Sequence, residues 1–515
     1  MRNHWSRREA LLLGGAAGLA LTAGGLLVPR AHAQEAQPKR GGRMRVAGAD
    51  SSTADTLDPA RASNDTDYCR LFMFYNGLTV FDEHLNPQPD LATSLETKDA
   101  KVWTIKLRKG VTFHDGSPFT ADDVVFTLNR HKDPKTGSVV RSLASAMAEI
   151  KATAPDEVQI TLNSPNAELP TIFAVYQFVI VKNGTTDFNK GNGTGPFICR
   201  EFSPGIRSVG VRNPNYFHEG RPYIDQIVFT GITDSAARVN ALLSGDLDMT
   251  EIDVRSAAQV KAASGFEIFE TKSGDYTDLI MHLDAPQIGN PDFVMAMKYL
   301  QNRQQILNSV LLGYGSIGND HPIAPSSPYY DSSIPVREFD PDKAKSLLQR
   351  AGMLDKSFQL VSSPAATGSP DMAVILQNAA QGIGFNLQVR RVPADGFWSN
   401  FWLKAPFTYG NINPRPNPDI LFSLFFQSSA PWNESRWKSE KFDKLLLDAR
   451  AETDFAKRKA IYGDMQRMVR DEAGIGIPAF ISSLDAHTSK VKGLRPIATA
   501  GFMGDNFAQY VWLDS

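Results

Sequence analysis

The sequence predicts an α/β protein of about three structural units. In Trp103–Arg130, an alternation of apolar and polar residues typical of a strand is followed by the apolar spacing of a helix. In Asp340–Val361, a helix with clear start and stop signals precedes a strand. The chain has 515 residues, more than a single hydrophobic core encloses, so several such units are expected.

The first 33 residues have the features of a Tat-type signal peptide. Arg7 and Arg8 precede a Gly- and Ala-rich apolar run, Ala10–Val28, and Ala31–Ala33 fits a small-x-small cleavage site. The alternative is an uncleaved membrane anchor, which the glycines in the run and the cleavage site directly after it disfavour. The residue directly after the cleavage site is Gln34 and not a cysteine, which argues against a lipoprotein. We expect export to the periplasm and a soluble protein from Gln34 onward.

The composition is that of an ordinary soluble globular protein, with 42% hydrophobic and 21% charged residues. Residues 1–33 hold four arginines and one glutamate, so 50 basic and 55 acidic residues remain after them, a net charge of −5. Such a surface has no broad attraction for nucleic acid or anionic lipid. The two cysteines, Cys69 and Cys199, allow either one disulfide that closes a long loop or two separately buried thiols.

The first predicted elements are strands. Met44–Ala49 is expected to be a strand that ends in a polar loop. Trp103–Leu107 alternates as a half-buried strand does, and a Lys-Gly turn then leads to Val111–Phe113, so these two segments are predicted to be paired strands. Thr120 is a good N-cap for the helix that follows. Its apolar stripe consists of Val124, Val125 and Leu128.

The second half of the chain contains clear helix signals. Asp340 as N-cap, a proline at the first helical position and Gly352 just past the end define one helix, after which Phe358–Val361 is a predicted strand. Ser439–Arg450 and Asp454–Asp471 also have helical periodicity, and their apolar stripes are interpreted as core.

Several segments carry a family resemblance. They are Trp103–Arg130, GTGPF at 193–197, RNPNYF at 212–217, GRPYIDQIVF at 220–229, ARVNALLSGDLDM at 237–249, and in the second half AMKYLQNRQQILNSVLLGYG and FDPDKAKSLLQRAG. In order and spacing the chain resembles the solute-binding proteins of peptide/nickel/opine-type ABC importers, extracellular family 5. The resemblance implies a two-lobed, clam-like periplasmic-binding-protein fold of class II, with an extra small α/β domain inserted in the first lobe.

The same resemblance implies how the chain is divided. Lobe I is expected from residues 34–53, 191–270 and 486–515, the small extra domain from 54–190, and lobe II from 271–485. Two crossings between the lobes then make a hinge, and the ligand is held between the halves.

Motifs of catalysis are not found in the sequence. It contains no G-x-S-x-G, H-E-x-x-H, G-x-x-x-x-G-K-[ST] or C-x-x-C motif. The seven histidines after residue 33 are dispersed, with no pair at metal-binding spacing. We therefore predict no catalytic residue, no cofactor and no metal site.

A loop rich in turn formers, 409–419, is the main candidate for ligand contact. In dipeptide- and oligopeptide-binding relatives the corresponding loop presents an acidic residue to the α-amino group of the ligand. Asn411 and Asn413 stand near that place here, which puts amino-terminus anchoring in doubt. Arg415 offers a planar fork for an anionic ligand group, with a solvated or structural arginine as the alternative. Asp419 is either the missing carboxylate or the N-cap of the next helix.

Further ligand contacts are expected elsewhere. A loop with one large aromatic beside amide and carboxylate groups favours Trp432 and Asn433 as contacts. The resemblance adds residues that correspond to ligand-facing loops of the family, namely Ser52, Thr53, Tyr75, Asn76, Asp275 and Tyr276.

The resemblance and the site together predict the substrate-binding component of an ABC importer. It would capture a short peptide or an amino-acid derivative, such as an opine-like conjugate, with an anionic group, and would act as a monomer with an inner-membrane permease and its cytoplasmic ATPases. One alternative is a secreted hydrolase or transferase that uses the same cleft. The other is a periplasmic peptide chaperone that works without a transporter.

Overall fold

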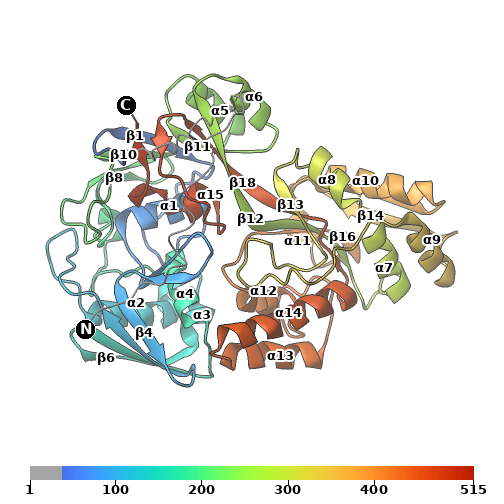
Figure 1. Ribbon diagram of the computed structural model, residues 1–515, viewed down its shortest axis with the longest axis horizontal. Helices are drawn as coiled ribbons and strands as arrows, with labels where there is room; N and C mark the ends of the chain where they lie inside the picture. The colour runs from blue at the N-terminus through green and yellow to red at the C-terminus, as the bar shows by residue number, and fades with distance from the viewer. Residues whose placement is uncertain (1–36, 515) are drawn as a thin grey trace, which may run out of the picture. The chain divides into compact units, whose positions relative to one another are not determined.

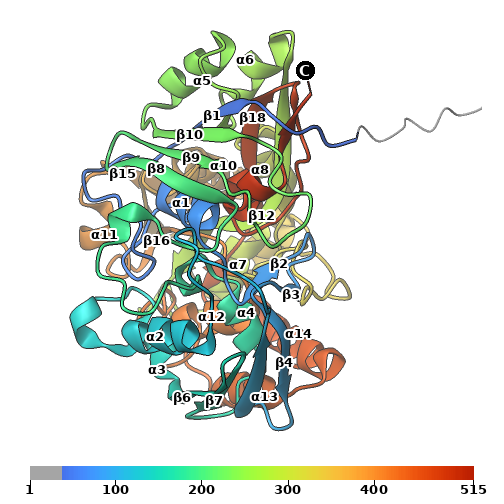
Figure 2. The same cartoon turned by 90° about the vertical axis from the view of Figure 1, so that its left-hand side faces the viewer.

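A mixed sheet of twelve strands organises the protein (Figures 1 and 2). The computed structural model describes residues 37–514, so the predicted signal peptide, residues 1–33, lies outside the described residues. The sheet runs in the order β15 (Asn386–Arg391), β14 (Ser357–Ser362), β16 (Phe407–Ile412), β12 (Phe266–Met281), β18 (Ala479–Thr488), β11 (Met249–Ile252), β1 (Arg43–Gly48), β10 (Gln226–Gly231), β9 (Arg207–Arg212) and β8 (Phe197–Ser203). Two short strands join from the side, β13 (Gly315–Ile317) on β18 and β17 (Ile475–Gly476) on β12. The strand predicted at Met44–Ala49 is confirmed as β1.

The long strands β12 and β18 connect the two halves of this sheet (Figure 1). They are antiparallel, and their register shifts between Thr271 and Asp275. On one side of the shift β18 pairs with β11, and on the other side it pairs with β13 while β12 pairs with β16. Residues 270 and 485, near which the lobe crossings are expected, lie within these two strands.

A separate sheet of four strands is formed by the segment that contains Trp103. Its order is β4 (Ala92–Thr97), β5 (Val102–Leu107), β7 (Glu157–Leu162) and β6 (Met147–Ala154). The predicted pairing of Val111–Phe113 with β5 is wrong, because both edges of β5 are occupied by β4 and β7. Val111 and Phe113 are buried, but the segment forms only an isolated bridge from Thr112 to Pro118. Two further strand pairs are β2 (Thr79–Phe81) with β3 (Pro87–Pro89) and β19 (Val491–Lys492) with β20 (Trp512–Leu513).

Helices surround the sheets, and those predicted from capping signals are confirmed. In α2 (Ala121–Lys132), Thr120 and Asp123 form a capping box, and α9 (Pro341–Arg350) is capped by Asp340, whose side chain accepts a hydrogen bond from the backbone N–H of Lys343. The two later helical predictions are confirmed as α13 (Glu440–Ala451) and α14 (Phe455–Glu472). The others are α1 (Asp65–Phe74), α3 (Arg141–Ser145), α4 (Leu169–Phe173), α5 (Ser235–Leu243), α6 (Ala257–Ala262), α7 (Pro291–Leu300), α8 (Arg303–Ser309), α10 (Ser369–Gly382), α11 (Phe397–Asn400), α12 (Pro418–Phe425) and the short turn α15 (Gly501–Gly504), with 3₁₀ turns at Pro134–Thr136, Tyr176–Phe178, Phe188–Lys190 and Phe507–Gln509.

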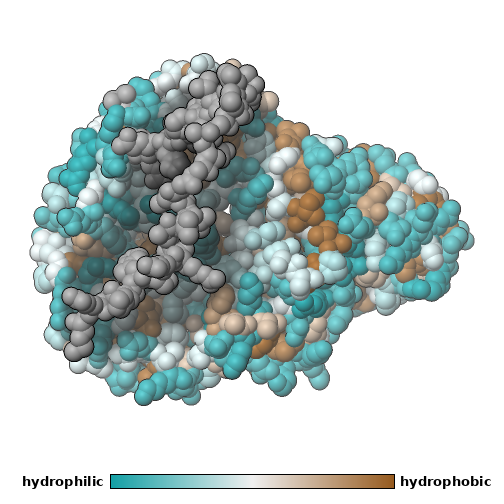
Figure 3. Space-filling model, in the orientation of Figure 1, coloured by the Kyte–Doolittle hydropathy of each residue, from teal (hydrophilic) through white to brown (hydrophobic). Residues whose placement is uncertain are grey.

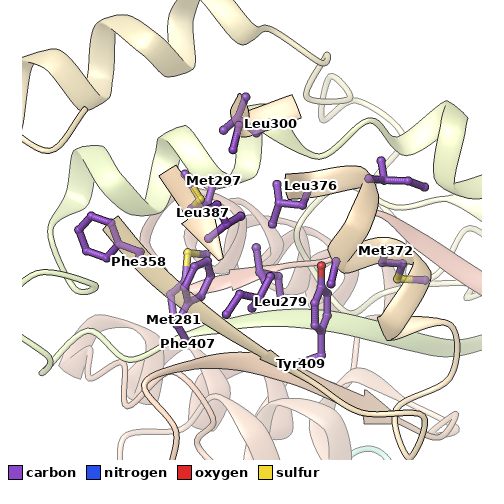
Figure 4. Packing of buried hydrophobic residues seen from close by; sticks show 14 of the residues in the cluster. Leu279, Met281, Met297, Leu300, Phe358, Met372, Leu376, Leu387, Phe407 and Tyr409 are labelled. Atoms are coloured by element: carbon purple, nitrogen blue, oxygen red, sulfur yellow. The ribbon is translucent and has the colours of Figure 1, made fainter. Parts of the chain in front are cut away.

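One hydrophobic core packs helices against the β12 half of the large sheet (Figure 4). Leu279 and Met281 of β12 lie beside Phe407 and Tyr409 of β16, and side chains from α7 and α10 close over them. These side chains are almost completely buried. Burial of this apolar area is the main force that holds the helices on the sheet.

On the face drawn in Figure 3, hydrophilic residues predominate and hydrophobic residues form small groups. None of the helices in residues 37–514 has the length and apolar character that a bilayer crossing requires. Cys69 and Cys199 are both free, the first buried and the second partly buried, so of the two arrangements left open by the sequence the structure contains separate thiols.

Candidate ligand-binding site

A cavity of about 900 Å³ opens beside the point where β12 and β18 cross from one half of the sheet to the other. This volume lies within the range of roughly 300–1,000 Å³ typical of small-molecule sites. Its wall is contributed by α1, by the segments 139–143, 174–177 and 482–484, by the end of β11, by the loop 413–424 and by residues 497–506. Segments far apart in the sequence therefore share one enclosed space.

The loop between β16 and α12, which was predicted to contact ligand, forms part of this wall. Asn417 caps α12 by accepting a hydrogen bond from the backbone N–H of Ile420 at 3.0 Å. Arg415 donates from one Nη to the carbonyl oxygens of Asn413 and Pro414, at 3.1 and 2.9 Å. Because no acidic side chain within residues 37–514 makes an ion pair with Arg415, its charge remains available to a ligand.

Asp419 also lines the cavity, but its carboxylate already has a cation. Arg450 donates from Nε to Asp419 Oδ1 at 2.5 Å and from Nη2 to the hydroxyl of Ser423. The alternative role of Asp419 as helix N-cap is wrong, since Asn417 holds that position. This ion pair makes Asp419 a poorer partner for an ammonium group than a carboxylate without a cation.

Asp275 is a carboxylic acid in the same cavity wall that interacts electrostatically with Arg415. Asn411 donates from Nδ2 to Asp275 Oδ1 and to the carbonyl oxygen of Tyr276, both at 2.9 Å. Burial raises the pKa of Asp275 to about 7, while the Asn411 hydrogen bond and the charge of Arg415 lower it. Asn411 is thus a residue that orients Asp275.

The twelve residues predicted to contact ligand fall into two groups. Five lie in the wall of the cavity: Asp275, Asn413, Arg415, Asp419 and Trp432. Seven lie outside this wall: Ser52, Thr53, Tyr75, Asn76, Tyr276, Asn411 and Asn433.

Several of the second group have clear local partners. The amide of Asn76 donates to Asp90 and to the hydroxyl of Tyr216, at 3.0 and 3.1 Å. The amide of Asn433 donates to the carbonyl oxygens of Gln427 and Trp437. Ser52 and Thr53 are exposed in a turn, and Tyr75 and Tyr276 are packed in two hydrophobic clusters.

Part of the cavity wall was missed by sequence reasoning. Asp65, Glu251 and Asp505 form an acidic stretch of the wall, and next to it the rings of Tyr68 and Tyr176 stack with centroids 3.5 Å apart. Asp65 follows the N-cap Asn64, so in the sequence it resembles an ordinary acidic residue in a first helical turn. No local pattern shows that residues near positions 65, 251 and 505 meet.

Asp485 lies behind this wall. Its Oδ2 accepts a hydrogen bond from the backbone N–H of Phe502 at 2.8 Å, and its Oδ1 has no hydrogen-bond partner among the described residues. Burial, together with the nearby Glu251, raises the pKa of Asp485 to about 8, although the Phe502 hydrogen bond opposes the shift. At neutral pH this carboxyl is therefore largely protonated.

The raised pKa of Asp485 predicts a pH-dependent difference between the wild type and Asp485→Asn. The folded state binds this proton more tightly than the unfolded state, so the stabilisation is complete below the unfolded pKa near 4 and is lost as pH rises through about 8. The asparagine variant lacks this loss. We expect the variant to gain stability relative to wild type between pH 5 and pH 9, as measured by urea unfolding at both pH values. An equal change in the free energy of unfolding of wild type and variant between the two pH values would contradict the assignment. Asp355→Asn, at an exposed position, is the control.

A buried contact joins the small four-stranded region to the helices beyond the cavity. Glu168, at the start of α4, accepts a hydrogen bond from the hydroxyl of Tyr329 and is ion-paired with Arg458, at 2.5 and 2.7 Å. Its second oxygen accepts from the amide of Asn417 at 3.2 Å. Since Asn417 caps α12, this contact reaches the loop that carries Arg415.

A cavity lined by distant segments, with a few orienting charges, is the kind of site that holds a small solute. The family model for bacterial extracellular solute-binding proteins, family 5, matches residues 86–434, and the chain belongs to that family. The family is made up of binding proteins.

Relatives and solved structures agree with this membership. The dipeptide-binding protein of Escherichia coli (strain K12) is 26% identical over 450 residues, which cover 79% of this chain and 83% of that protein. The nickel-binding periplasmic protein of the same strain is 26% identical over 469 residues, covering 83% and 88%. The crystal structure of the ABC transporter substrate-binding protein CtaP from Listeria monocytogenes has a TM-score of 0.82 at 21% identity and covers 93% of this chain and all of that one. The two-lobed fold that the resemblance implied is thus confirmed.

Proposed function

We propose that this protein is the periplasmic component of an ABC importer that captures a short peptide or an amino-acid-derived solute and delivers it to an inner-membrane permease with cytoplasmic ATPases. The observation that carries the proposal is the cavity of about 900 Å³, whose wall includes Asp275 and Arg415, an arginine with no acidic ion-pair partner among residues 37–514. This arrangement suits a ligand with a carboxylate or a similar anionic group. The proposal includes Tat-type export, a monomer and no chemical step.

Mass spectrometry of the small molecules that co-purify with the protein tests this function. We expect a peptide or amino-acid conjugate, which on re-addition raises the Tm by mass action. A panel of dipeptides, opines and nickel–histidine chelates extends the test. A protein that releases no such molecule and is stabilised by none of the panel would overturn the proposed ligand class, and turnover of the bound molecule would favour the hydrolase alternative.

The proposed mechanism is closure around the ligand. We propose that residues 34–53, 191–270 and 486–515 form lobe I, that 54–190 form the small domain attached to it, and that 271–485 form lobe II. The register shift between β12 and β18 at Thr271 and Asp275 supports a hinge at the crossing. A ligand that contacts both lobes only when they are closed then shifts the population to the closed state.

Arg415→Ala tests the anionic contact. Loss of a charge-assisted hydrogen bond is expected to weaken binding of the co-purified ligand about tenfold to a hundredfold. Isothermal titration calorimetry measures this, and Arg200→Ala is the control because Arg200 is an exposed arginine outside the cavity. An unchanged dissociation constant for Arg415→Ala would show that this arginine is structural.

A further inference from the structure

The acidic wall of the cavity holds carboxyl groups that lack nearby cations in the part of the chain that the structure describes, and the anionic contact at Arg415 does not explain them. Asp65, Glu251 and Asp505 come from α1, from β11 and from the turn after α15, and all three line the cavity. Arg238 lies 4.0 Å from Glu251, whereas neither Asp65 nor Asp505 has an ion-pair partner among the described residues. Three carboxyl groups thus share a wall with one distant cation.

The carboxyl group of Asp505, in this wall, lacks a hydrogen-bond partner among the residues described for one of its oxygens. Its side chain is 1% exposed, Oδ1 accepts from the thiol of Cys69 at 3.5 Å, and Oδ2 has no partner within residues 37–514. A buried polar atom without a partner is costly unless another group satisfies it. Behind the wall, a Cβ placed on Gly501 would lie 3.1 Å from the unpartnered Oδ1 of Asp485, and Gly501 itself lines the cavity. Two buried carboxyl oxygens, one on Asp505 in the wall and one on Asp485 behind it, therefore lack partners among residues 37–514.

Two aromatic rings lie beside these carboxyl groups in the cavity wall. Tyr68 and Tyr176 line the cavity as a stacked pair, and both interact electrostatically with Asp65, Asp505 and the nearby Arg415. Aromatic faces beside carboxylates are the environment that binds an ammonium or guanidinium group, through cation–π attraction and charge-assisted hydrogen bonds.

We propose that Asp65, Glu251 and Asp505, with Tyr68 and Tyr176, form a subsite for an organic cation, so that the solute carries an ammonium or guanidinium group at this wall and its anionic group at the nearby Arg415. The inference rests on the proposed function, because it assigns ligand chemistry to the same cavity. A metal ion is not the occupant, since these carboxyl groups do not form a metal-binding cluster within the described part of the chain.

The pKa values of the carboxyl groups in the wall support the subsite. Desolvation in and behind the cavity wall, together with the neighbouring carboxyl groups, raises the pKa of Asp65 to about 6 and of Glu251 to about 7, and raises the pKa of Asp505 well above its usual range. A positive ligand group would relieve the mutual repulsion and favour the ionised carboxylates.

Simple cations test the subsite independently of the natural ligand. We expect n-butylammonium and methylguanidinium chloride to raise the Tm of the wild type saturably, beyond sodium chloride at equal ionic strength, and to lose this effect in Asp65→Asn/Asp505→Asn. Asparagine tolerates the positive φ of 67° at position 505, and the fold of the variant is checked by circular dichroism. Exposed Glu219→Gln is the matched control. Cations that act on the wild type only as sodium chloride does would overturn the subsite.

A pair of isosteric peptides then tests its use in ligand recognition. N-acetyl-lysyl-alanine and N-acetyl-norleucyl-alanine have no α-ammonium and differ in one side-chain ammonium. We expect the former to bind at least about tenfold more tightly, a ratio that falls to about one in the double variant. Equal affinities would overturn the assignment of the cationic end. If neither peptide binds, the peptide part of the proposed function fails, and the result with the simple cations still decides the subsite.

Discussion

Replacing Asp320 by asparagine is expected to lower the free energy of unfolding by about 3–5 kcal/mol, because it leaves buried guanidinium groups without their anion. Asp320 is fully buried and accepts from Arg303 at 2.7 Å and from Arg337 at 2.8 Å. It also accepts a hydrogen bond from the backbone N–H of Ile477. One carboxylate therefore pairs with two arginines in the interior.

The Asp320→Asn substitution removes the negative charge and keeps the shape of the side chain. Asp320 has a φ of 58°, and asparagine tolerates this conformation as well as aspartate does, so backbone strain is not added. Urea unfolding of the variant, with Asp355→Asn as an exposed control, measures the effect. A loss no larger than that of the control would show that the arginines find other partners, of which Asp471 beside Arg337 is the nearest.

Glu168→Gln is expected to weaken ligand binding at least about tenfold, by making closure less favourable. Glu168 is 1% exposed and joins the small domain to Tyr329, Arg458 and Asn417 of the proposed lobe II. Removing its charge leaves Arg458 without its carboxylate, which is costly in a buried site. These contacts are made only when the two regions are together, so their loss favours the open state.

Calorimetry with the co-purified ligand and small-angle scattering without it check this expectation. The scattering should show a more open average conformation for Glu168→Gln than for wild type. Glu149→Gln, an exposed carboxylate on β6 of the same domain, serves as the control. Unchanged affinity together with unchanged scattering would show that the contact does not control closure.

The elements that the sequence predicted well are those whose signals are local. For α9, the cap at Asp340, the proline after it and Gly352 beyond its end are all adjacent to the helix. The segment Val111–Phe113 was mispredicted because its strand-like alternation does not say which edge is free, and both edges of β5 are already paired. Pairing is a property of the assembled sheet.

For the candidate site, too, residues with local signals were predicted and residues that only the tertiary fold brings together were missed. The loop that carries Arg415 was predicted because its turn formers and polar side chains are contiguous, and the structure places it in the cavity wall. Asp65 and Asp505 were missed, since only the tertiary fold brings residues so far apart in sequence to one wall. The correct interpretation of Asp419 likewise required Arg450, which lies on another helix.

The pairing of β12 with β18 has a mechanical consequence. Between the pairing of β18 with β11 on one side and of β12 with β16 on the other, the two crossing strands are hydrogen-bonded to each other and form a short two-stranded ribbon. Such a ribbon resists stretching, because every crossing residue would have to lose its partner, but it twists readily. We therefore expect the halves to rotate about the ribbon at a nearly constant separation, so that Asp275, next to the register shift, serves as the pivot around which Arg415 swings.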